Sequence, residues 1–471
     1  MGNFVQKRHP FIPVDAQCGF VLLSSIVPFE RSTAHASFTF QLSRTAMNQP
    51  LLPVTVISGF VGAGKTALVE QILSNRNGPR VAALVTDLAA VRLDIDNAAP
   101  ASSAALRVDL PNGCACVQAD EDVLEQLAGL AAEDRFDAIV VESAATDEPL
   151  NIVESILEDE SLATLVRVDT AVTVLDAAAF LRDYASTDAL SERGIAAYED
   201  DDRTIVEVLI EQVEFSDVFV INKADLVSAD DLAHLQAVLV ALNPRAAQIV
   251  SSYGNAPVEE VLGTARFDYD VTSNAAGWLA LLHDPSSHEE KSGGQGVGHV
   301  VYRARRPFHP ERLWALLHEE WKGVLRGKGF FWLATRNEIG GSLSQAGGAC
   351  RPAPAGTWWA AQDRSEWPEG DDELLEEIAA DWYGDADDFT IGDRRQELVL
   401  IGVDIDPAQW RAKFDACLLT DAEYALGAEG WLALADPFPA WDLEDDDHDH
   451  DHGHDHHHHD HDDDGHHHHH H

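Results

Sequence analysis

The sequence feature that most constrains the fold is a glycine-rich loop between an apolar strand and a helical pattern. The predicted strand is Val54–Ser58, and the loop reads Gly-Phe-Val-Gly-Ala-Gly-Lys-Thr over residues 59–66. This spacing matches the phosphate-binding pattern G-x-x-x-x-G-K-[ST]. Glycines let backbone N–H groups approach phosphate oxygens, and the N-terminus of the following helix adds a positive dipole end. The motif therefore predicts a nucleotide-binding domain.

Two side chains of the loop are expected to have the roles that such residues play in phosphoryl-transfer enzymes. Lys65 is expected to bridge the β- and γ-phosphates, and the Thr66 hydroxyl is expected to bind Mg²⁺. The residues predicted to contact the phosphates are Gly59, Gly62, Ala63, Gly64, Lys65 and Thr66.

Short apolar runs alternate with helical patterns from Leu51 to about Ser251. Near-continuous apolar strands separated by helices are typical of a parallel sheet covered on both faces. The predicted strands are Val54–Ser58, Val81–Val85, Asp137–Glu142, Ala171–Leu175 and Asp217–Ile221. The pattern predicts an α/β domain of the P-loop NTPase type over residues 51–283.

Glu142 ends one of these apolar strands. An acid at the C-terminal end of a strand beside the phosphate loop is placed to hold Mg²⁺ or its water. Taken alone, such an acid is more often a solvated loop residue, but the phosphate loop favours the metal-binding role. We therefore group Lys65, Thr66 and Glu142 as the predicted catalytic residues.

A second nucleotide signal, Asn222-Lys223-Ala224-Asp225, follows the last predicted strand of this domain. The Asp225 carboxylate can accept hydrogen bonds from the N1–H and N2 amino groups of guanine, whereas adenine has no matching pair of donors. Asn222, Lys223 and Asp225 are therefore predicted to read the base, and GTP is predicted over ATP.

Two cysteines, Cys114 and Cys116, lie between the phosphate loop and Glu142. Thiolates are soft ligands that suit Zn²⁺, and a tight turn allows both to meet one ion. A tetrahedral site needs further ligands, so the alternative of two ordinary buried cysteines stays open.

The rest of the chain divides by composition. Residues 1–50 precede the first convincing strand and are expected to be a disordered or mis-assigned extension, with Met47 as the alternative start. Residues 284–298 are polar and glycine-bearing and are typical of a linker. Residues 299–440 are predicted to form a smaller α+β domain, with strands near Val300–Arg305 and Glu397–Ile401.

The charge is strongly acidic, with 81 Asp and Glu against 32 Lys and Arg and a net charge of −49. Such an excess disfavours nucleic acid as a direct ligand. The chain holds no apolar run near the roughly 18 residues of a membrane span, so no membrane association is expected. Five cysteines, an odd and sparse set, favour a reducing, cytoplasmic location.

Residues 441–471 form a His- and Asp-rich tail that is expected to be disordered without metal. Imidazoles are common Zn²⁺ ligands, so the tail is predicted to buffer several ions loosely. The final six histidines, residues 466–471, are alternatively a purification tag. The histidines assigned to the buffer are His448, His450, His452, His454 and His456.

Taken together, these motifs resemble the CobW-like GTPases, a family that includes zinc and cobalt metallochaperones and nitrile hydratase activators. The resemblance runs from about Pro53 to Asp421. It implies a P-loop domain, a CobW C-terminal domain, slow GTP hydrolysis and nucleotide-gated delivery of metal to a client protein. Besides the motifs above, it rests on Val174–Asp176, Glu211–Asp217, Arg305–Phe308, Arg326–Leu333 and Trp358–Trp359.

The chain departs from the family pattern at four points. Val117 replaces a third cysteine after Cys116, and Ala145 replaces a glycine whose N–H is expected to contact the γ-phosphate. The family's acid near Mg²⁺ appears one methylene shorter as Asp87, and Ala67 replaces a second hydroxyl after Thr66. The resemblance implies intact nucleotide recognition in a divergent member.

The function predicted from these signals is a GTP-hydrolysing zinc metallochaperone with GTP, Mg²⁺ and Zn²⁺ as cofactors. One alternative is a nucleotide-switched recruitment factor with little hydrolysis, linked to the ribosome and responsive to zinc status. Another is a factor that inserts cobalt or iron into a client enzyme, with Co²⁺ as the ion.

Overall fold

The computed structural model describes residues 50–75, 78–85, 105–109, 117–133, 135–198, 201–273, 276–283, 296–367 and 372–441. The predicted metal ligands Asp87, Cys114 and Cys116 lie outside the described residues. So do the N-terminal 49 residues and the histidines of the tail.

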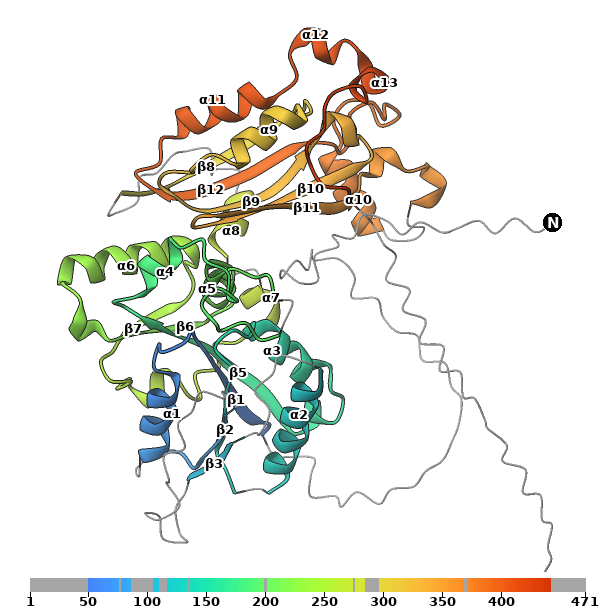
Figure 1. Ribbon diagram of the computed structural model, residues 1–471. Helices are drawn as coiled ribbons and strands as arrows, with labels where there is room; N and C mark the ends of the chain where they lie inside the picture. Colours follow the sequence, from blue (N-terminus) through green and yellow to red (C-terminus); the bar gives the residue numbers. More distant parts are fainter. Residues whose placement is uncertain are drawn as a thin grey trace, which may run out of the picture.

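The first domain is built on a seven-stranded parallel sheet with the order β3-β2-β4-β1-β5-β6-β7 (Figure 1). The strands are β1 Leu52–Ser58, β2 Val81–Val85, β3 Ala105–Asp109, β4 Ala138–Glu142, β5 Val166–Asp176, β6 Val218–Asn222 and β7 Ala247–Val250. Every strand that was predicted for this domain is present, and β3 and β7 extend the sheet at its two edges. The predicted α/β class is confirmed.

Strand β1 lies at the centre of this sheet, between β4 and β5. Ile57 pairs with Glu142 of β4, and Ser58 pairs with Thr173 of β5. Because parallel strands bring their carboxyl ends to one edge, the loop after β1 and the acid that ends β4 meet there.

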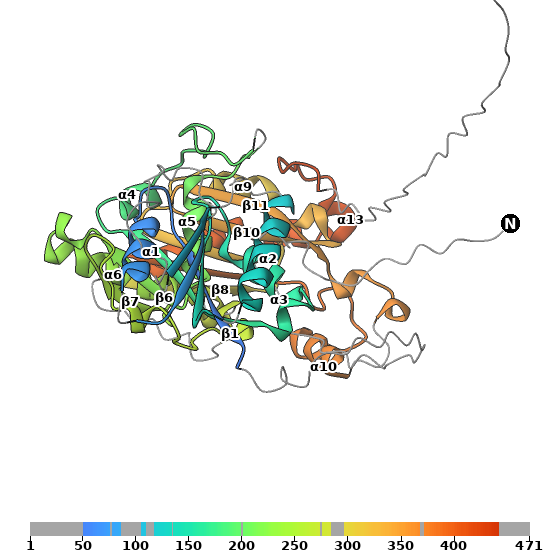
Figure 2. The ribbon, with the colours of Figure 1, turned by 90° about the horizontal axis from the view of Figure 1, so that it is seen from below.

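Helices cover both faces of the sheet. Alternate residues of each strand point to opposite faces, so Ile57 packs with α1 while Val54 and Val56 pack with α2 and α3. Figure 2 shows α1 on one side of the strands and α2 and α3 on the other. The helices are α1 Lys65–Ser74, α2 Val117–Ala132, α3 Pro149–Glu158, α4 Phe180–Tyr184, α5 Ile205–Glu214, α6 Ala229–Leu242, α7 Tyr269–Ser273 and α8 Gly277–His283.

The second domain has a five-stranded antiparallel sheet with the order β11-β10-β9-β12-β8. Its strands are β8 Val297–Ala304, β9 Val324–Trp332, β10 Ile339–Ala346, β11 Ala349–Thr357 and β12 Gln396–Val403. Its helices are α9 Pro310–Leu317, α10 Asp372–Asp381, α11 Pro407–Cys417, α12 Asp421–Tyr424 and α13 Gly427–Trp431.

The two faces of this second sheet have different partners. One face packs against α9 and α11 through an aromatic core that includes Phe331, Trp410 and Phe414. The opposite face carries Val301 and Val399, which pack against Trp278 of α8 and against α6 of the first domain. The two sheets therefore share a layer of helices between them (Figure 1).

None of the helices in the described part of the chain combines the length and the apolar composition needed to cross a bilayer.

Candidate nucleotide-binding site

The loop between β1 and α1 is held in a backbone conformation that its glycines allow. Gly59, Gly62 and Gly64 have φ values of 143°, 75° and 106°. At Gly64 a Cβ atom would lie 2.3 Å from the side-chain nitrogen of Asn222, so no other residue fits there without a shift. Glycine is thus required at Gly64 both by its φ and by a close neighbour.

Asn222, the last residue of β6, braces this loop. Its Nδ2 donates to the Ala63 carbonyl at 2.9 Å, and its Oδ1 accepts from the Gly254 N–H at 2.9 Å. The side chain is 2% exposed. Sequence reasoning assigned Asn222 to the base and missed this contact, which joins the phosphate loop to the segment after β7.

The predicted catalytic residues converge at the start of α1. The Lys65 ammonium donates to the Gly59 carbonyl at 2.7 Å and so lies across the loop. The Thr66 hydroxyl donates to Glu142 Oε1 at 2.8 Å, and Glu142 is fully buried at the end of β4. Two hard oxygen donors from different elements therefore meet beside the phosphate loop, and oxygen atoms are the ligands that Mg²⁺ prefers.

The predicted base-reading residues form the neighbouring part of the site. Lys223 has a φ of 58° and its Nζ pairs with the carboxylate of Asp176, the last residue of β5. Asp225 follows in a short 3₁₀ turn and is exposed. Sequence reasoning did not assign Asp176 a role, although Val174–Asp176 was one of the quoted motifs.

Tyr253 is a further feature at this end of the site. Its side chain is 83% exposed and its φ is 58°, which is uncommon for a residue other than glycine. It directly precedes Gly254, whose N–H is bound by Asn222. An exposed aromatic ring therefore lies next to the predicted base-binding residues, and no pattern in the sequence pointed to it.

The loop after β4 is held by α5. Gln212 Nε2 donates to the carbonyls of Ala145 at 3.0 Å and Asp147 at 3.3 Å. Glu211, the residue before Gln212, lies beside Glu148, which also pairs with Arg203 at 3.3 Å. Burial raises the pKa of Glu148, and burial together with the neighbouring Glu148 raises the pKa of Glu211 well above its usual range.

Two protein-family models match the chain. The model described as CobW/HypB/UreG, nucleotide-binding domain, matches residues 53–250. The model described as cobalamin synthesis protein cobW C-terminal domain matches residues 297–418. The chain belongs to the CobW family of GTPases.

Curated relatives span most of the same length. The zinc-regulated GTPase metalloprotein activator 1 of Dictyostelium discoideum is 36% identical over 406 residues, which cover 82% of this chain and 84% of that protein. A zinc chaperone of Mycobacterium tuberculosis is 30% identical over 351 residues, covering 71% and 79%. Among solved structures, the zinc-bound YjiA GTPase of E. coli matches at 16% identity and a TM-score of 0.36, over 79% of this chain and 100% of that one.

These findings confirm the predicted family, the fold class and the GTPase activity. The two family models fall on the two domains of the structure, and the parallel sheet carries the phosphate loop. The assignments of individual site residues remain predictions, as do the roles of Mg²⁺ and of the metal cargo.

The CobW C-terminal domain is joined to the GTPase domain by a buried ion pair. Arg326 of β9 donates two parallel hydrogen bonds to Glu214 at the end of α5, Nε to Oε1 at 2.8 Å and Nη2 to Oε2 at 3.0 Å. Only 3% of the Arg326 side chain is exposed. The same helix thus contacts the loop after β4 through Gln212 and the second domain through Glu214.

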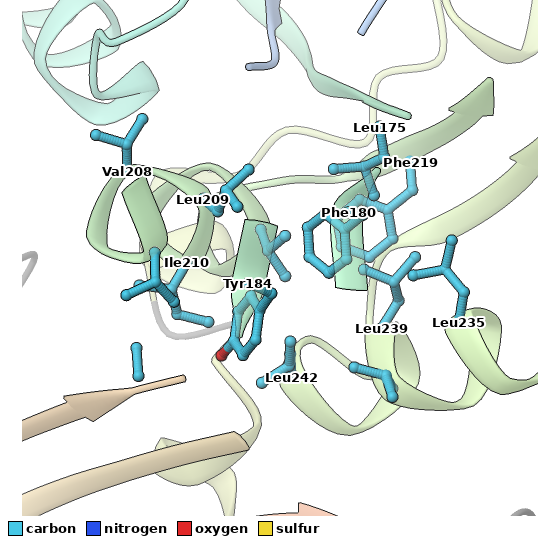
Figure 3. Packing of buried hydrophobic residues seen from close by; sticks show 14 of the residues in the cluster. Leu175, Phe180, Tyr184, Val208, Leu209, Ile210, Phe219, Leu235, Leu239 and Leu242 are labelled. Atoms are coloured by element: carbon cyan, nitrogen blue, oxygen red, sulfur yellow. The ribbon is translucent and has the colours of Figure 1, made fainter. Parts of the chain in front are cut away.

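An aromatic side chain adds to this junction. Figure 3 shows Tyr184 packed among the buried residues of α4, α5 and α6, with its hydroxyl turned towards the strands of the second domain. That hydroxyl donates to the Leu325 carbonyl at 2.9 Å. The β10–β11 turn approaches so closely that a Cβ on Gly347, where φ is 49°, would lie 1.8 Å from the Tyr184 carbonyl. The two domains are therefore closely packed here.

Within the described ranges, the structure brings together no group of three or more His, Cys, Asp or Glu side chains that could hold a metal ion. The two described cysteines, Cys350 and Cys417, are reduced, and burial raises the pKa of Cys350 to about 12.

Proposed function

We propose that the chain is a cytoplasmic metallochaperone that uses GTP hydrolysis to deliver zinc to a client protein. The observation that carries this proposal is the convergence of Lys65, Thr66 and Glu142 at the phosphate loop, next to a guanine-type motif. The zinc assignment draws support from two relatives whose names link them to zinc. The client is defined only as a protein that receives the metal.

The donor set at the phosphate loop fits GTP with Mg²⁺. The backbone N–H groups of residues 62–66 and the Lys65 ammonium would hold the β- and γ-phosphates. The Thr66 hydroxyl and the Glu142 carboxylate would bind the ion or its water, with Asp87 as a further acid near it. When bound, Mg²⁺ neutralises charge that develops on the phosphates.

Guanine selectivity is assigned to Asp225 with Lys223 and Asn222. Replacing Asp225 by Asn turns a double acceptor into a side chain with a donor, which suits the O2 carbonyl of xanthine instead of the guanine amino group. We expect Asp225→Asn to weaken GTP binding at least about tenfold and to strengthen xanthosine triphosphate binding. Competition titrations with both nucleotides measure the change, and equal losses for both would count against base reading by Asp225.

The cargo is assigned to Cys114 and Cys116, with the tail histidines as a loose store that raises the local zinc concentration. Zinc titration of the full chain with a non-hydrolysable GTP analogue, and with GDP, tests the proposal. We expect one site whose affinity differs between the two nucleotides, and its loss in Cys114→Ser. The tail supplies weaker sites that do not respond to nucleotide. A zinc affinity that is the same in both nucleotide states would contradict the chaperone hypothesis.

The coupling route is assigned to α5. This helix holds Ala145, which replaces the family glycine expected to contact the γ-phosphate, and it also holds Arg326 of the CobW C-terminal domain. A shift of the loop after β4 on hydrolysis would reach the second domain through two side chains of one rigid element. Pull-down of partners with Lys65→Ala as control would identify the client and would separate it from a ribosome-linked factor.

A further inference from the structure

A polar cavity of about 490 Å³ opens in the CobW C-terminal domain beside Leu282 of α8, away from the phosphate loop. It lies where β8 ends and β12 begins, since Ala304 pairs with Gln396 there. We call it the arginine pocket and define it by five of its lining side chains, Arg303, Arg305, Arg395, Asp381 and Glu397. One of them, Arg305, begins the Arg305–Phe308 motif, to which the proposed function gives no role.

Two of the three arginines are neutralised within the pocket. Arg303 Nε donates to Glu397 Oε1 at 2.8 Å, and Arg395 Nε donates to Glu397 Oε2 at 2.7 Å. Arg395 also pairs with Asp381 at 2.9 Å. Burial alone would raise the pKa of Glu397, but Arg395 and Arg303 outweigh it and lower that pKa. Both oxygens of Glu397 are therefore already engaged.

Arg305 is held differently. Its Nη1 donates to the carbonyls of Gly392 and Arg394, each at 3.3 Å, and its guanidinium lies 5.8 Å from the ring centroid of Tyr383. Within the described part of the chain it forms no ion pair, and its Nε and Nη2 make no hydrogen bond. Burial and, to a smaller extent, the neighbouring Arg395 lower its pKa, against the opposite effect of the carboxylates of Asp381, Glu397 and Asp393.

The unused edge of Arg305 has a defined chemical preference. Nε and Nη2 present two parallel N–H groups, the fork that matches the two oxygens of a carboxylate or phosphate. The lining holds three guanidinium groups and two carboxylates, and Asp393 is a third carboxylate that acts on Arg305. The pocket is therefore close to neutral, in a chain whose net charge is −49. A doubly charged phosphate would meet the carboxylates of Asp381 and Glu397, so a singly charged carboxylate fits better.

We propose that the arginine pocket binds a carboxylate side chain of an acidic peptide segment through Nε and Nη2 of Arg305. The volume exceeds that of one side chain and lies within the range of small-ligand sites, so it admits neighbouring peptide atoms. Two sources have this chemistry: the run Asp442–Asp447 of this chain and an acidic segment of a second protein. The inference does not depend on zinc or on GTP turnover.

The test uses the full-length chain and a labelled peptide, Asp-Leu-Glu-Asp-Asp-Asp, amidated at its C-terminus. Binding is measured by fluorescence anisotropy at about 0.15 M salt, because salt at this concentration screens the long-range repulsion between the peptide and the acidic protein. We expect saturable binding of this peptide and none of the matching peptide in which Asn and Gln replace the acids. Inorganic phosphate that displaces the peptide at lower concentration than acetate would contradict the carboxylate assignment.

Two substitutions act in opposite directions on the same pocket. Arg305→Lys keeps the charge but loses the fork, and we expect it to weaken binding about tenfold. Asp381→Asn removes a competing carboxylate, and we expect it to tighten binding about threefold or more. Because a gain of affinity does not arise from misfolding, Asp381→Asn keeps the test valid if Arg305→Lys is unstable. GTP turnover is expected to be unchanged in both variants.

Arg364→Lys is the matched control, because Arg364 is an exposed arginine of the same domain that pairs with Asp387. We expect it to bind the peptide like the unmodified chain. Tighter peptide binding after replacement of Asp445, Asp446 and Asp447 by Asn assigns the pocket to this chain's own tail, and unchanged binding assigns it to a second protein. Absence of saturable binding, or equal affinity in Arg305→Lys, Asp381→Asn and the unmodified chain, overturns the proposal.

Discussion

At the scale of single residues, the site depends on side chains that hold the phosphate loop as much as on those expected to touch nucleotide. Asn222 bridges the Ala63 carbonyl and the Gly254 N–H while fully enclosed by protein. A buried amide with both ends engaged contributes through the two hydrogen bonds and through the cost of leaving either partner unsatisfied. Asn222 therefore fixes the position of the loop between β1 and α1.

Replacing Asn222 by Ala removes both bonds and leaves the Ala63 carbonyl and the Gly254 N–H unpaired. We expect the free energy of unfolding to fall by about 2 kcal/mol and GDP affinity to fall about tenfold. Urea unfolding and nucleotide titration measure the two effects. Asn222→Asp keeps the acceptor for Gly254 but sets a buried carboxylate oxygen against the Ala63 carbonyl, so it should destabilise the protein at least as much as Asn222→Ala. GDP affinity unchanged in both variants would contradict the bracing role.

At the scale of elements, α5 contacts both the loop after β4 and the second domain. It begins with a capping box, in which Thr204 accepts from the Glu207 N–H and Glu207 accepts from the Thr204 N–H. Its middle carries Glu211, which shares a hydrogen bond with Glu148 and whose pKa is raised by burial. Its last turn carries Glu214, an acid that the helix dipole disfavours and that Arg326 compensates.

The buried Glu211–Glu148 pair predicts a pH dependence of stability. Because the pKa of Glu211 is raised in the folded state, its contribution is fully present below the unfolded pKa of 4.5 and is lost as pH rises through the folded pKa. Glu211→Gln resembles the protonated form. The variant should therefore gain stability relative to the unmodified chain as pH increases from about 5 to about 8.

Urea unfolding of both proteins at the two pH values gives this difference, and groups unaffected by the substitution cancel in it. A relative stability of Glu211→Gln that is constant with pH, or that falls as pH rises, would contradict the assignment of the proton to this pair.

At the scale of the whole molecule, an ion pair between Arg326 and Glu214 joins the two domains. Two hydrogen bonds join Arg326 and Glu214, and 3% of the Arg326 side chain and 15% of the Glu214 side chain are exposed. Removing one member of such a pair leaves the charge of the other member without a partner, whereas removing both members leaves no unpaired charge. The pair therefore favours this one arrangement of the domains over others.

Arg326→Met and Glu214→Leu, made singly, should each lower the free energy of unfolding by about 3 kcal/mol. The double variant should cost less than the sum of the two. Urea unfolding of the four proteins completes the cycle. Arg351→Gln is the control, because Arg351 also spans the domains, pairing with Glu207 at 2.6 Å, but is 41% exposed and should cost less than about 1 kcal/mol. Additive effects at Arg326 and Glu214 would show that the pair is not coupled.

Much of the candidate site was predictable from local patterns. Lys65 and Thr66 belong to a phosphate-binding motif that its residue spacing alone identifies. Glu142 ends a strand that an apolar run predicts. Asp176, Gln212 and Arg326 also lie in motifs that the sequence analysis quoted, yet none received a role. A motif shows that a residue type recurs in a pattern, but it does not identify the atom that the side chain contacts.

The sequence by itself determined where the phosphate loop lies, which runs form the central strands and which family the chain resembles, because each depends on residues within a few positions of one another. Only the tertiary structure decided that Asn222 braces Ala63, that Gln212 holds Ala145 and that Arg326 meets Glu214. These partners lie 159, 67 and 112 positions apart. Contacts at such separations arise from the order and register of the strands, which local periodicity does not encode.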